Sequence, residues 1–306
     1  MEPFNINIIG CGSAIPTLRH FNSSQVVEIR GKLFMIDCGE GTQMQLRRSH
    51  IKFTKISAVF ISHIHGDHCF GLIGMISTFG MLGRTAPLHV YAPVELHDML
   101  MEQIKMFCPH LDFEVPFHVV DTTKFATVYE DRSLTVTSIP LQHRMPCCGY
   151  LFREKPTLPH IRRDMLDFYE IPISQVNNIK NGVSWTLPDG EVIPNEKLTE
   201  PAEPARAYAY CSDTRYIPDL HKYLKDVNVL YHESTYSDDN IARAEKYYHS
   251  TASQAAKLAR DAKVNMLLLG HYSARYDNET LLLDEARAIF PLTYLSAEGD
   301  IISIQN

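Results

Sequence analysis

"ISHIHGDHCFG", residues 61–71, places three histidines and one aspartate within six positions: His63, His65, Asp67 and His68. His63 and His65 alternate as on an extended segment, so their side chains can point the same way. Gly66 permits a sharp turn of the backbone, after which we expect a helix to begin. Imidazole and carboxylate ligands suit zinc, or less tightly manganese or iron. The alternative is a histidine-rich surface turn that binds no metal.

Apolar runs on both sides of this loop predict short strands that alternate with helices. The predicted strands are "INIIG" (6–10), "SQVVEI" (24–29), "LFMID" (33–37), "ISAVFIS" (56–62), "PLHVYAP" (87–93) and "VNVLYHEST" (227–235). The predicted helices are "QMQLRRS" (43–49), "VELHDMLMEQIKMF" (94–107) and "DDNIARAEKYY" (238–248). This alternation predicts an α/β fold in which helices cover the surfaces of a sheet.

Residues 154–206 break the alternation, because they are rich in Pro, Asn and Glu. They contain one hairpin signal, "SWTLPDGEVI" (184–193), in which Pro-Asp-Gly separates two short β-like runs. We interpret the segment as an arm inserted into a single domain that spans residues 1–306. Trp185 in this hairpin could stack on a nucleobase or pack locally.

Composition limits the function classes. The formal net charge of −7 argues against binding to polyanions through an overall basic surface. The start "MEPFNINIIGCGS" resembles no signal peptide, and the longest apolar runs fall far below the roughly 20 residues that span a bilayer. Seven scattered cysteines with no C-x-x-C pair signal neither a disulfide framework nor a thiolate zinc site. We therefore expect a cytoplasmic protein.

A second metal would need ligands from other segments, and three candidates each follow an apolar, strand-like run: His143 in "SIPLQHRMP", Asp213 in "AYAYCSDTR" and His271 in "NMLLLGHYS". Strand ends are the positions from which an α/β sheet presents site residues at one edge. A carboxylate such as Asp213 can bridge two cations about 3.5–4 Å apart. Taken singly, a histidine after a strand is more often an ordinary surface or core residue.

The order of these residues resembles the five-motif pattern of the metallo-β-lactamase superfamily. Within it, finer features resemble the ribonuclease Z (tRNase Z) family of tRNA 3′-processing endonucleases: "FMIDCGEGTQMQL" (34–46), "YHEST" (231–235), "HSTASQAA" (249–256) and "GHYSARY" (270–276). The resemblance spans nearly the whole chain. It implies an αββα sandwich with a di-zinc site at one edge of the two sheets, and a homodimer.

Carried over to this chain, the resemblance assigns one zinc to His63, His65 and His143, the other to Asp67, His68 and His271, and a bridging role to Asp213. Two zinc ions lower the pKa of a shared water and make hydroxide available as an in-line nucleophile on a phosphodiester. Asp67 could also accept the proton of that water. Asp37 and Glu40 receive no metal role; we expect them to organise the backbone under the metal loop.

The departing 3′-oxygen needs a proton, and His249 is the candidate donor. Thr251 and Gln254 fit a capping box, so His249 lies just before a helix N-terminus that favours a phosphate. Glu233 could orient the His249 ring. Without the resemblance, the favoured interpretation of His249 is a surface residue that precedes the helix N-cap. Ser273 and Arg275 are candidate phosphate contacts, with a solvated loop as the alternative.

Two features depart from the family. The arm lacks the Gly-Pro-rich segment with which typical members grip the tRNA elbow, and its six basic and nine acidic residues give a formal charge of −3. The basic loop near the N-terminus is altered to "PTLRHFN", which leaves Arg19 as its main cation. From the resemblance, we predict a zinc-dependent endoribonuclease that removes the 3′ trailer from precursor tRNA. The alternatives are a general phosphodiesterase for small or unstructured substrates and a non-catalytic RNA-binding or scaffold subunit.

Overall fold

The computed structural model describes residues 2–305, and the chain divides into two compact units. One unit runs to Arg153 and resumes at Arg206, and the other is Glu154–Ala205. Within the described residues, no helix combines the length and apolarity needed to cross a bilayer. The first unit holds every candidate site residue named above.

Two mixed sheets form the centre of the first unit. The strands of the first sheet are Phe4–Gly10 (β1), Ser24–Ile29 (β2), Lys32–Ile36 (β3), Ile56–Phe60 (β4), His89–Ala92 (β5), Phe117–Val119 (β6) and Ile301–Ser303 (β18). Their order is β18-β1-β2-β3-β4-β5-β6. The five strands predicted in this part of the chain are confirmed, whereas β6 and β18 are three residues long and too short to leave a pattern.

The strands of the second sheet are Ala126–Glu130 (β7), Leu134–Pro140 (β8), Cys148–Glu154 (β9), Ala207–Cys211 (β14), Val229–Glu233 (β15), Met266–Gly270 (β16) and Thr293–Leu295 (β17). Their order is β17-β16-β15-β14-β9-β8-β7. β14 to β17 run parallel to one another, so their carboxyl ends meet at the same edge of the sheet.

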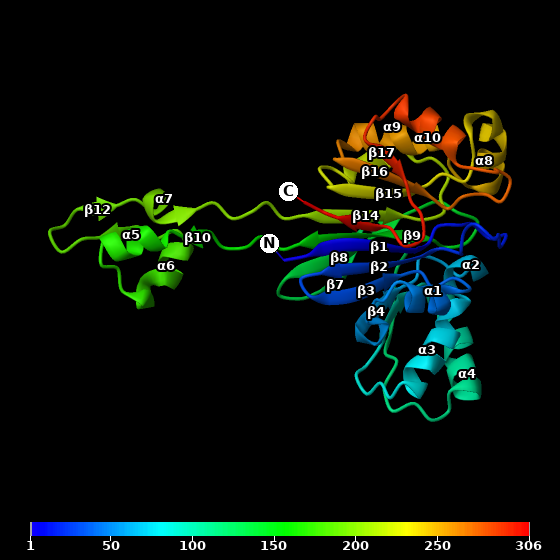
Figure 1. Cartoon of the computed structure of the whole chain (residues 1–306), viewed down its shortest axis with the longest axis horizontal. Helices are drawn as coiled ribbons and strands as arrows, with labels where there is room; N and C mark the ends of the chain where they lie inside the picture. Colours follow the sequence, from blue (N-terminus) through cyan, green and yellow to red (C-terminus); the bar gives the residue numbers. More distant parts are fainter. Residues whose placement is uncertain (1, 306) are drawn as a thin grey trace. The chain divides into compact units, whose positions relative to one another are not determined.

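The helices of this unit are Thr42–Arg48 (α1), Gly66–Cys69 (α2), Gly71–Met81 (α3), His97–Phe107 (α4), Ile241–Tyr247 (α8), Ala252–Ala262 (α9) and Thr280–Arg287 (α10). Short 3-10 turns add Phe53–Lys55 (η1), Val94–Leu96 (η2), Pro218–Lys222 (η4) and Asp238–Asn240 (η5). Figure 1 shows α1, α3 and α4 beneath the first sheet and α9 and α10 above the second. The layers are therefore α, β, β and α, as predicted.

Aromatic rings fill the space between the two sheets. Phe60 of β4 lies edge-on to Phe152 of β9, with ring centroids 5.4 Å apart, and edge-on to Tyr150 at 5.3 Å. All three rings are buried. Burying one such side chain contributes roughly 1.5–3 kcal/mol to folding. A second cluster, which includes Leu46, Met75 and Leu100, packs the first sheet against α1, α3 and α4.

The second unit is small and has its own core. Its elements are His160–Ile161 (β10), Arg163–Phe168 (α5), Ile173–Gln175 (η3), Val176–Lys180 (α6), Trp185–Thr186 (β11), Val192–Ile193 (β12), Asn195–Leu198 (α7) and Thr199–Glu200 (β13). β11 and β12 pair as the predicted hairpin. Trp185 packs against the cluster of Ile179, Ile193 and Leu198, which favours local packing for its ring.

Candidate metal centre

The seven predicted ligands come from four segments and meet at one edge of the sandwich. The loop after β4 carries His63, His65, Asp67 and His68, and α2 begins at Gly66 as expected. The other three ligands follow β8, β14 and β16: His143, Asp213 and His271. The structure brings all seven together in two overlapping groups.

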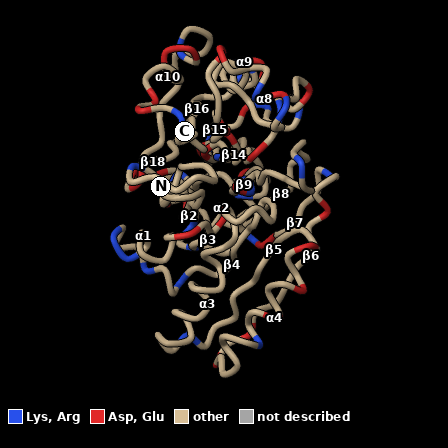
Figure 2. The backbone as a smooth tube through the Cα atoms, turned by 90° about the vertical axis from the view of Figure 1, so that its right-hand side faces the viewer, with Lys and Arg blue, Asp and Glu red and all other residues tan. Residues whose placement is uncertain are grey.

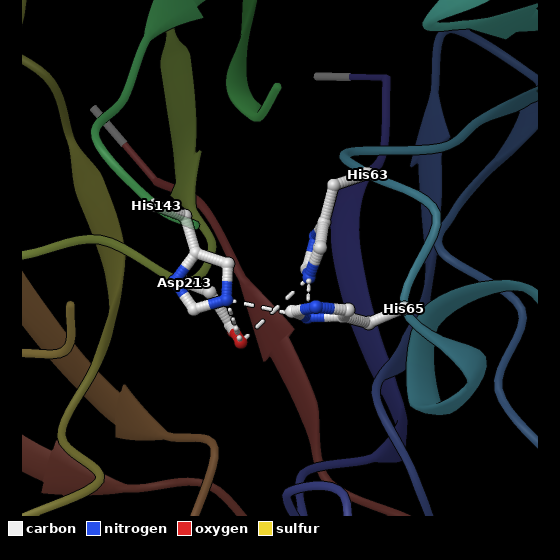
Figure 3. A group of neighbouring side chains, drawn as sticks. All are labelled: His63, His65, His143 and Asp213. Atoms are coloured by element: carbon white, nitrogen blue, oxygen red, sulfur yellow. Dashed lines mark hydrogen bonds and ion pairs between the residues drawn. The ribbon is translucent and has the colours of Figure 1, made fainter. Parts of the chain in front are cut away.

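The first group consists of His63, His65, His143 and Asp213. His65 Nδ1 lies 3.0 Å from His63 Nε2 and 3.2 Å from His143 Nε2. The Oδ2 atom of Asp213 lies 3.8 Å from the Nε2 atoms of both His63 and His143. Figure 3 shows the three rings and the carboxylate pointing toward a common centre.

The second group consists of Asp67, His68, His271 and again Asp213. Asp67 Oδ2 lies 3.3 Å from the Nε2 atoms of both His68 and His271. Asp213 Oδ1 lies 3.4 Å from His68 Nε2 and 3.1 Å from His271 Nε2. One oxygen of Asp213 therefore faces each group, which is the arrangement of a bridging carboxylate.

Four of the histidine rings are held by hydrogen bonds through Nδ1. His68 Nδ1 donates to Asp37 Oδ2 at 2.8 Å and His143 Nδ1 donates to the Tyr248 carbonyl oxygen at 2.9 Å. His63 Nδ1 lies 3.0 Å from Ser62 Oγ, and His271 Nδ1 lies 2.8 Å from Thr235 Oγ1. With a proton on Nδ1, each ring presents a bare Nε2 to the centre, as metal-binding histidines do.

Asp37 accepts several of the hydrogen bonds beneath the loop. Its carboxylate accepts from the Ser62 N–H at 2.7 Å, from Ser62 Oγ at 2.9 Å and from Tyr210 Oη at 2.7 Å, besides His68. A Cβ at Gly39 would lie 2.3 Å from the Asp67 carbonyl oxygen, so only glycine allows this close approach. The expectation that Asp37 organises the metal loop is consistent with these contacts, whereas Glu40 is exposed.

We expect Asp37→Asn to weaken the binding of a divalent metal ion, measured with Zn²⁺ as the probe, by about 10- to 100-fold, the usual effect of removing a group that orients a ligand. The carboxylate of Asp37 has two acceptor oxygens, whereas an amide has one oxygen and one NH₂ group. In either orientation, the NH₂ group of the amide would face a donor from Ser62 or His68. Competition with a chromophoric chelator measures the affinity. Glu40→Gln in the same segment is the matched control, and an unchanged affinity in Asp37→Asn would contradict this role.

The protonation states suit a cation. Burial lowers the pKa values of His63, His65 and His143, so these rings are neutral and can act as ligands. Burial raises the pKa of Asp67, but a positive charge on His68 and hydrogen bonds from His271 and His68 outweigh this and hold the pKa well below its usual value.

Burial lowers the pKa of His68, but the carboxylates of Asp67, Asp213 and Asp37 outweigh burial and raise it well above its usual value. A bound cation would displace the His68 proton and leave Nε2 as a ligand atom. Among residues 2–305, the buried atoms His68 Nε2 and Asp213 Oδ1 have no hydrogen-bond partner. The carboxylates around His68 favour a positive charge at this point, and a divalent metal ion between His68 Nε2 and Asp213 Oδ1, which lie 3.4 Å apart, would supply it.

His249 lies beside the ligands, in contact with Glu233. Its Nδ1 donates to Glu233 Oε1 at 2.9 Å, and its ring centroid lies 5.1 Å from that of His143. Glu233 is buried and also accepts from the backbone N–H groups of Thr214 and Thr235. Burial lowers the pKa of His249, but the Glu233 carboxylate more than offsets this and raises the pKa to about 9. Bound cations would oppose this upward shift.

The helix after His249 begins as predicted. Thr251 is the N-cap of α9, its side chain accepts from the Gln254 N–H, and the Gln254 side chain accepts from the Thr251 N–H. This is the predicted capping box. It fixes the backbone that carries His249.

A cavity of about 530 Å³ lies over the ligands. The predicted contacts Ser273 and Arg275 line it, and the Arg275 guanidinium lies over the Tyr236 ring, 5.6 Å from its centroid. Several lining residues were missed by sequence reasoning, among them Arg144, Arg243 and Tyr247. Figure 2 shows basic residues on α8, which carries Arg243 and Lys246. Arg144 directly follows a predicted ligand, the one signal that could have indicated it.

Curated relatives match the full length of the chain. The protein named Ribonuclease Z from Bacteroides fragilis is 56% identical over 304 residues, which cover 99% of this chain and 100% of the relative. Ribonuclease Z from Phocaeicola vulgatus is 56% identical over 306 residues, which cover 100% and 99% of the two chains. A family model described as "Anti-Pycsar protein Apyc1" matches residues 4–156.

Solved structures support the fold. The short form of human tRNase Z superposes with a TM-score of 0.70 at 24% identity and covers 99% of this chain and 100% of its own. YhfI from Bacillus subtilis, a metallo-β-lactamase fold protein, has a TM-score of 0.68 at 17% identity, with 99% and 100% covered. The predicted metallo-β-lactamase fold is confirmed by these likenesses together with the α, β, β, α layers.

Proposed function

Because the chain belongs to the ribonuclease Z family and is an endoribonuclease that removes the 3′ trailer of precursor tRNA, we propose that its two ligand groups hold two zinc ions that serve this cleavage. Residues 4–156 also belong to the family described as Anti-Pycsar protein Apyc1. Asp213, His249 and His271 lie outside the residues that this family model matches. The alignments with the ribonuclease Z relatives, in contrast, extend over all three positions.

His63, His65 and His143 would hold one ion and Asp67, His68 and His271 the other, with Asp213 between them. The observation that carries this proposal is that one carboxylate oxygen of Asp213 faces each of the two ligand groups. Zinc at these positions would lower the pKa of a water and neutralise charge on the phosphodiester. All seven ligands are present and converge, which disfavours a vestigial site.

The chain's own residues would move the protons of the reaction. Asp67 would accept a proton from the attacking water, and His249 would donate one to the departing 3′-oxygen of the tRNA. Glu233 would keep the His249 ring in place through the 2.9 Å hydrogen bond. The products are a tRNA with a 3′-hydroxyl and a trailer with a 5′-phosphate. Ser273 and Arg275 would bind phosphate oxygens in the cavity.

We also propose a homodimer and an inserted arm at residues 154–206. Four large apolar side chains at the ends of the neighbouring helices α3 and α4 are exposed: Met81, Leu82, Met106 and Phe107. Exposed apolar groups gathered in this way are typical of protein–protein contacts.

The separate core of Glu154–Ala205 supports the arm. The seven free, buried cysteines fit a reducing compartment, and we propose the cytoplasm.

The acidic arm is the reason to test the substrate directly. In the arm, Arg163 and Lys180 line one cavity together with Asp167, and Arg162 pairs with Asp164 at 3.1 Å, so its cations are partly neutralised. The alternative function is therefore a general phosphodiesterase that no longer depends on a tRNA grip.

We expect kcat/KM for a precursor tRNA to exceed that for bis(p-nitrophenyl) phosphate by about 10³-fold or more, because remote contacts contribute to the transition state. Both rates are measured on the zinc-loaded protein, and the RNA products are mapped to find the cleaved bond. Cleavage at the trailer junction supports the proposal. Turnover of the small diester alone would assign the site to a general phosphodiesterase.

A further inference from the structure

A second cavity, of about 620 Å³, opens beside the metal centre. The segment between β8 and β9 forms one wall, and η4 with the residue that follows it, Tyr223, forms another. His143 and Arg144 line both this cavity and the one over the ligands. The two cavities are therefore neighbours along the same wall, and a ligand chain that leaves the metal centre past His143 would enter the second one.

Exposed aromatic side chains gather at this second cavity. Tyr223 and Tyr248 line it and are 41% and 37% exposed. Phe125, also 41% exposed, stacks on Tyr223 with ring centroids 4.5 Å apart and planes 20° apart. Aromatic rings left open to solvent are the groups on which single-stranded nucleic acids stack their bases, without preference for sequence.

The charges around the cavity favour a polyanion. The Arg215 guanidinium lies over the Tyr248 ring, 5.2 Å from its centroid, and Arg144 lines the wall shared with the metal centre. The nearby carboxylates are neutralised, because Asp219 pairs with Lys222 and Asp121 pairs with Lys124, each at 2.8 Å. The two arginines therefore leave an excess of positive charge for phosphates.

A precursor tRNA offers two kinds of chain on the two sides of the scissile bond. The tRNA side is a duplex within a few nucleotides of the cut, and its stacked bases cannot enter a cavity of this size. The trailer side is a single strand, whose bases can splay out and stack on aromatic side chains. From this match, and resting on the proposed function, we propose that the second cavity binds the single-stranded 3′ trailer.

The test compares one precursor tRNA with a trailer of one nucleotide and with a trailer of about six nucleotides, a length within the span of one single-strand site. We expect the longer trailer to raise kcat/KM of the unmodified protein by about tenfold, since each stacked base strengthens binding. Tyr223→Ala should abolish this advantage while the one-nucleotide substrate is cleaved as before. Phe125→Ala should reduce the advantage in the same direction.

Tyr294→Ala is the matched control, because Tyr294 is a 42% exposed tyrosine on β17 that does not line the cavity. A 5′-phosphorylated RNA of about six nucleotides, the trailer product, should bind about tenfold more weakly to Tyr223→Ala than to Tyr294→Ala. Equal rates for the two trailers, or an advantage that survives in Tyr223→Ala, would overturn the inference. Failure of the unmodified protein to cleave either precursor, with bis(p-nitrophenyl) phosphate still hydrolysed, would instead overturn the proposed function and this inference with it.

Discussion

Asp67→Ala is expected to lower kcat/KM by about 10⁴-fold or more for both precursor tRNA and bis(p-nitrophenyl) phosphate, because in the proposed mechanism this one side chain is both a metal ligand and the proton acceptor. Asp67 Oδ2 lies 3.3 Å from His68 Nε2 and 3.3 Å from His271 Nε2, so its removal opens one side of the second ligand group. The loss should be equal for the two substrates, since the leaving group plays no part in it.

Metal content distinguishes this effect from a folding defect. We expect Asp67→Ala to retain the metal ion that we propose for His63, His65 and His143 and to lose part of the second one, as measured by elemental analysis of dialysed protein. The thermal unfolding transition should persist, because Asp67 lies at the edge of the sandwich, outside the apolar clusters. Asp98→Ala, an exposed aspartate on α4, is the control. Substantial activity in Asp67→Ala would rule out the two-metal mechanism.

The metal loop was predictable from sequence because its four ligands are local. An extended pair, a glycine and a helix start fix where His63, His65, Asp67 and His68 can point. Asp213 and His271 were predictable for a different reason, since each follows an apolar run and parallel strands end at one edge. The pairing of their strands with each other, however, depends on the order of the second sheet, which no local pattern encodes.

The groups that hold the ligands were harder to predict. The role of Asp37 in organising the metal loop was predicted, but its hydrogen bond to His68, 31 positions away, was not, because it depends on the packing of the segment after β3 beneath that loop. The Tyr248 carbonyl oxygen, which accepts from His143, is a backbone group and leaves no trace in side-chain chemistry. Tyr248 also adopts a left-handed conformation with φ of 60° although it is not glycine. Tyr248 is the C-cap of α8, a position at which left-handed residues commonly end a helix.

The arm shows where sequence patterns fail. Its hairpin was predicted because Pro188, Asp189 and Gly190 carry a turn signal of their own. The helices α5, α6 and α7 were not predicted, since they have four to six residues each and no repeating apolar face. The apolar core of the arm consists of Ile171, Ile179, Ile193 and Leu198 with a few partly buried neighbours. These residues are too scattered along the chain to be identified as a core from the sequence.

His249→Ala is expected to slow precursor tRNA cleavage by about 10²- to 10⁴-fold, the range that general acid catalysis supplies. The departing 3′-oxygen of a ribose is a strongly basic alkoxide that needs a proton as the bond breaks. The p-nitrophenolate anion is stable without one, so hydrolysis of bis(p-nitrophenyl) phosphate should slow by no more than about tenfold. Single-turnover rates of both substrates measure the difference between the two losses. His110→Ala, which replaces an exposed histidine, is the control.

The ratio between the two losses identifies the role of His249. A merely structural role would slow both substrates equally, because the 5.1 Å separation of the His249 and His143 rings lets a disturbance reach the ligands. A role in proton donation would slow the tRNA reaction far more than the diester reaction, and Glu233→Gln should then reproduce part of that selective loss through the weakened hydrogen bond to His249 Nδ1. Equal losses in both variants would remove His249 from proton transfer and leave water as the donor to the 3′-oxygen.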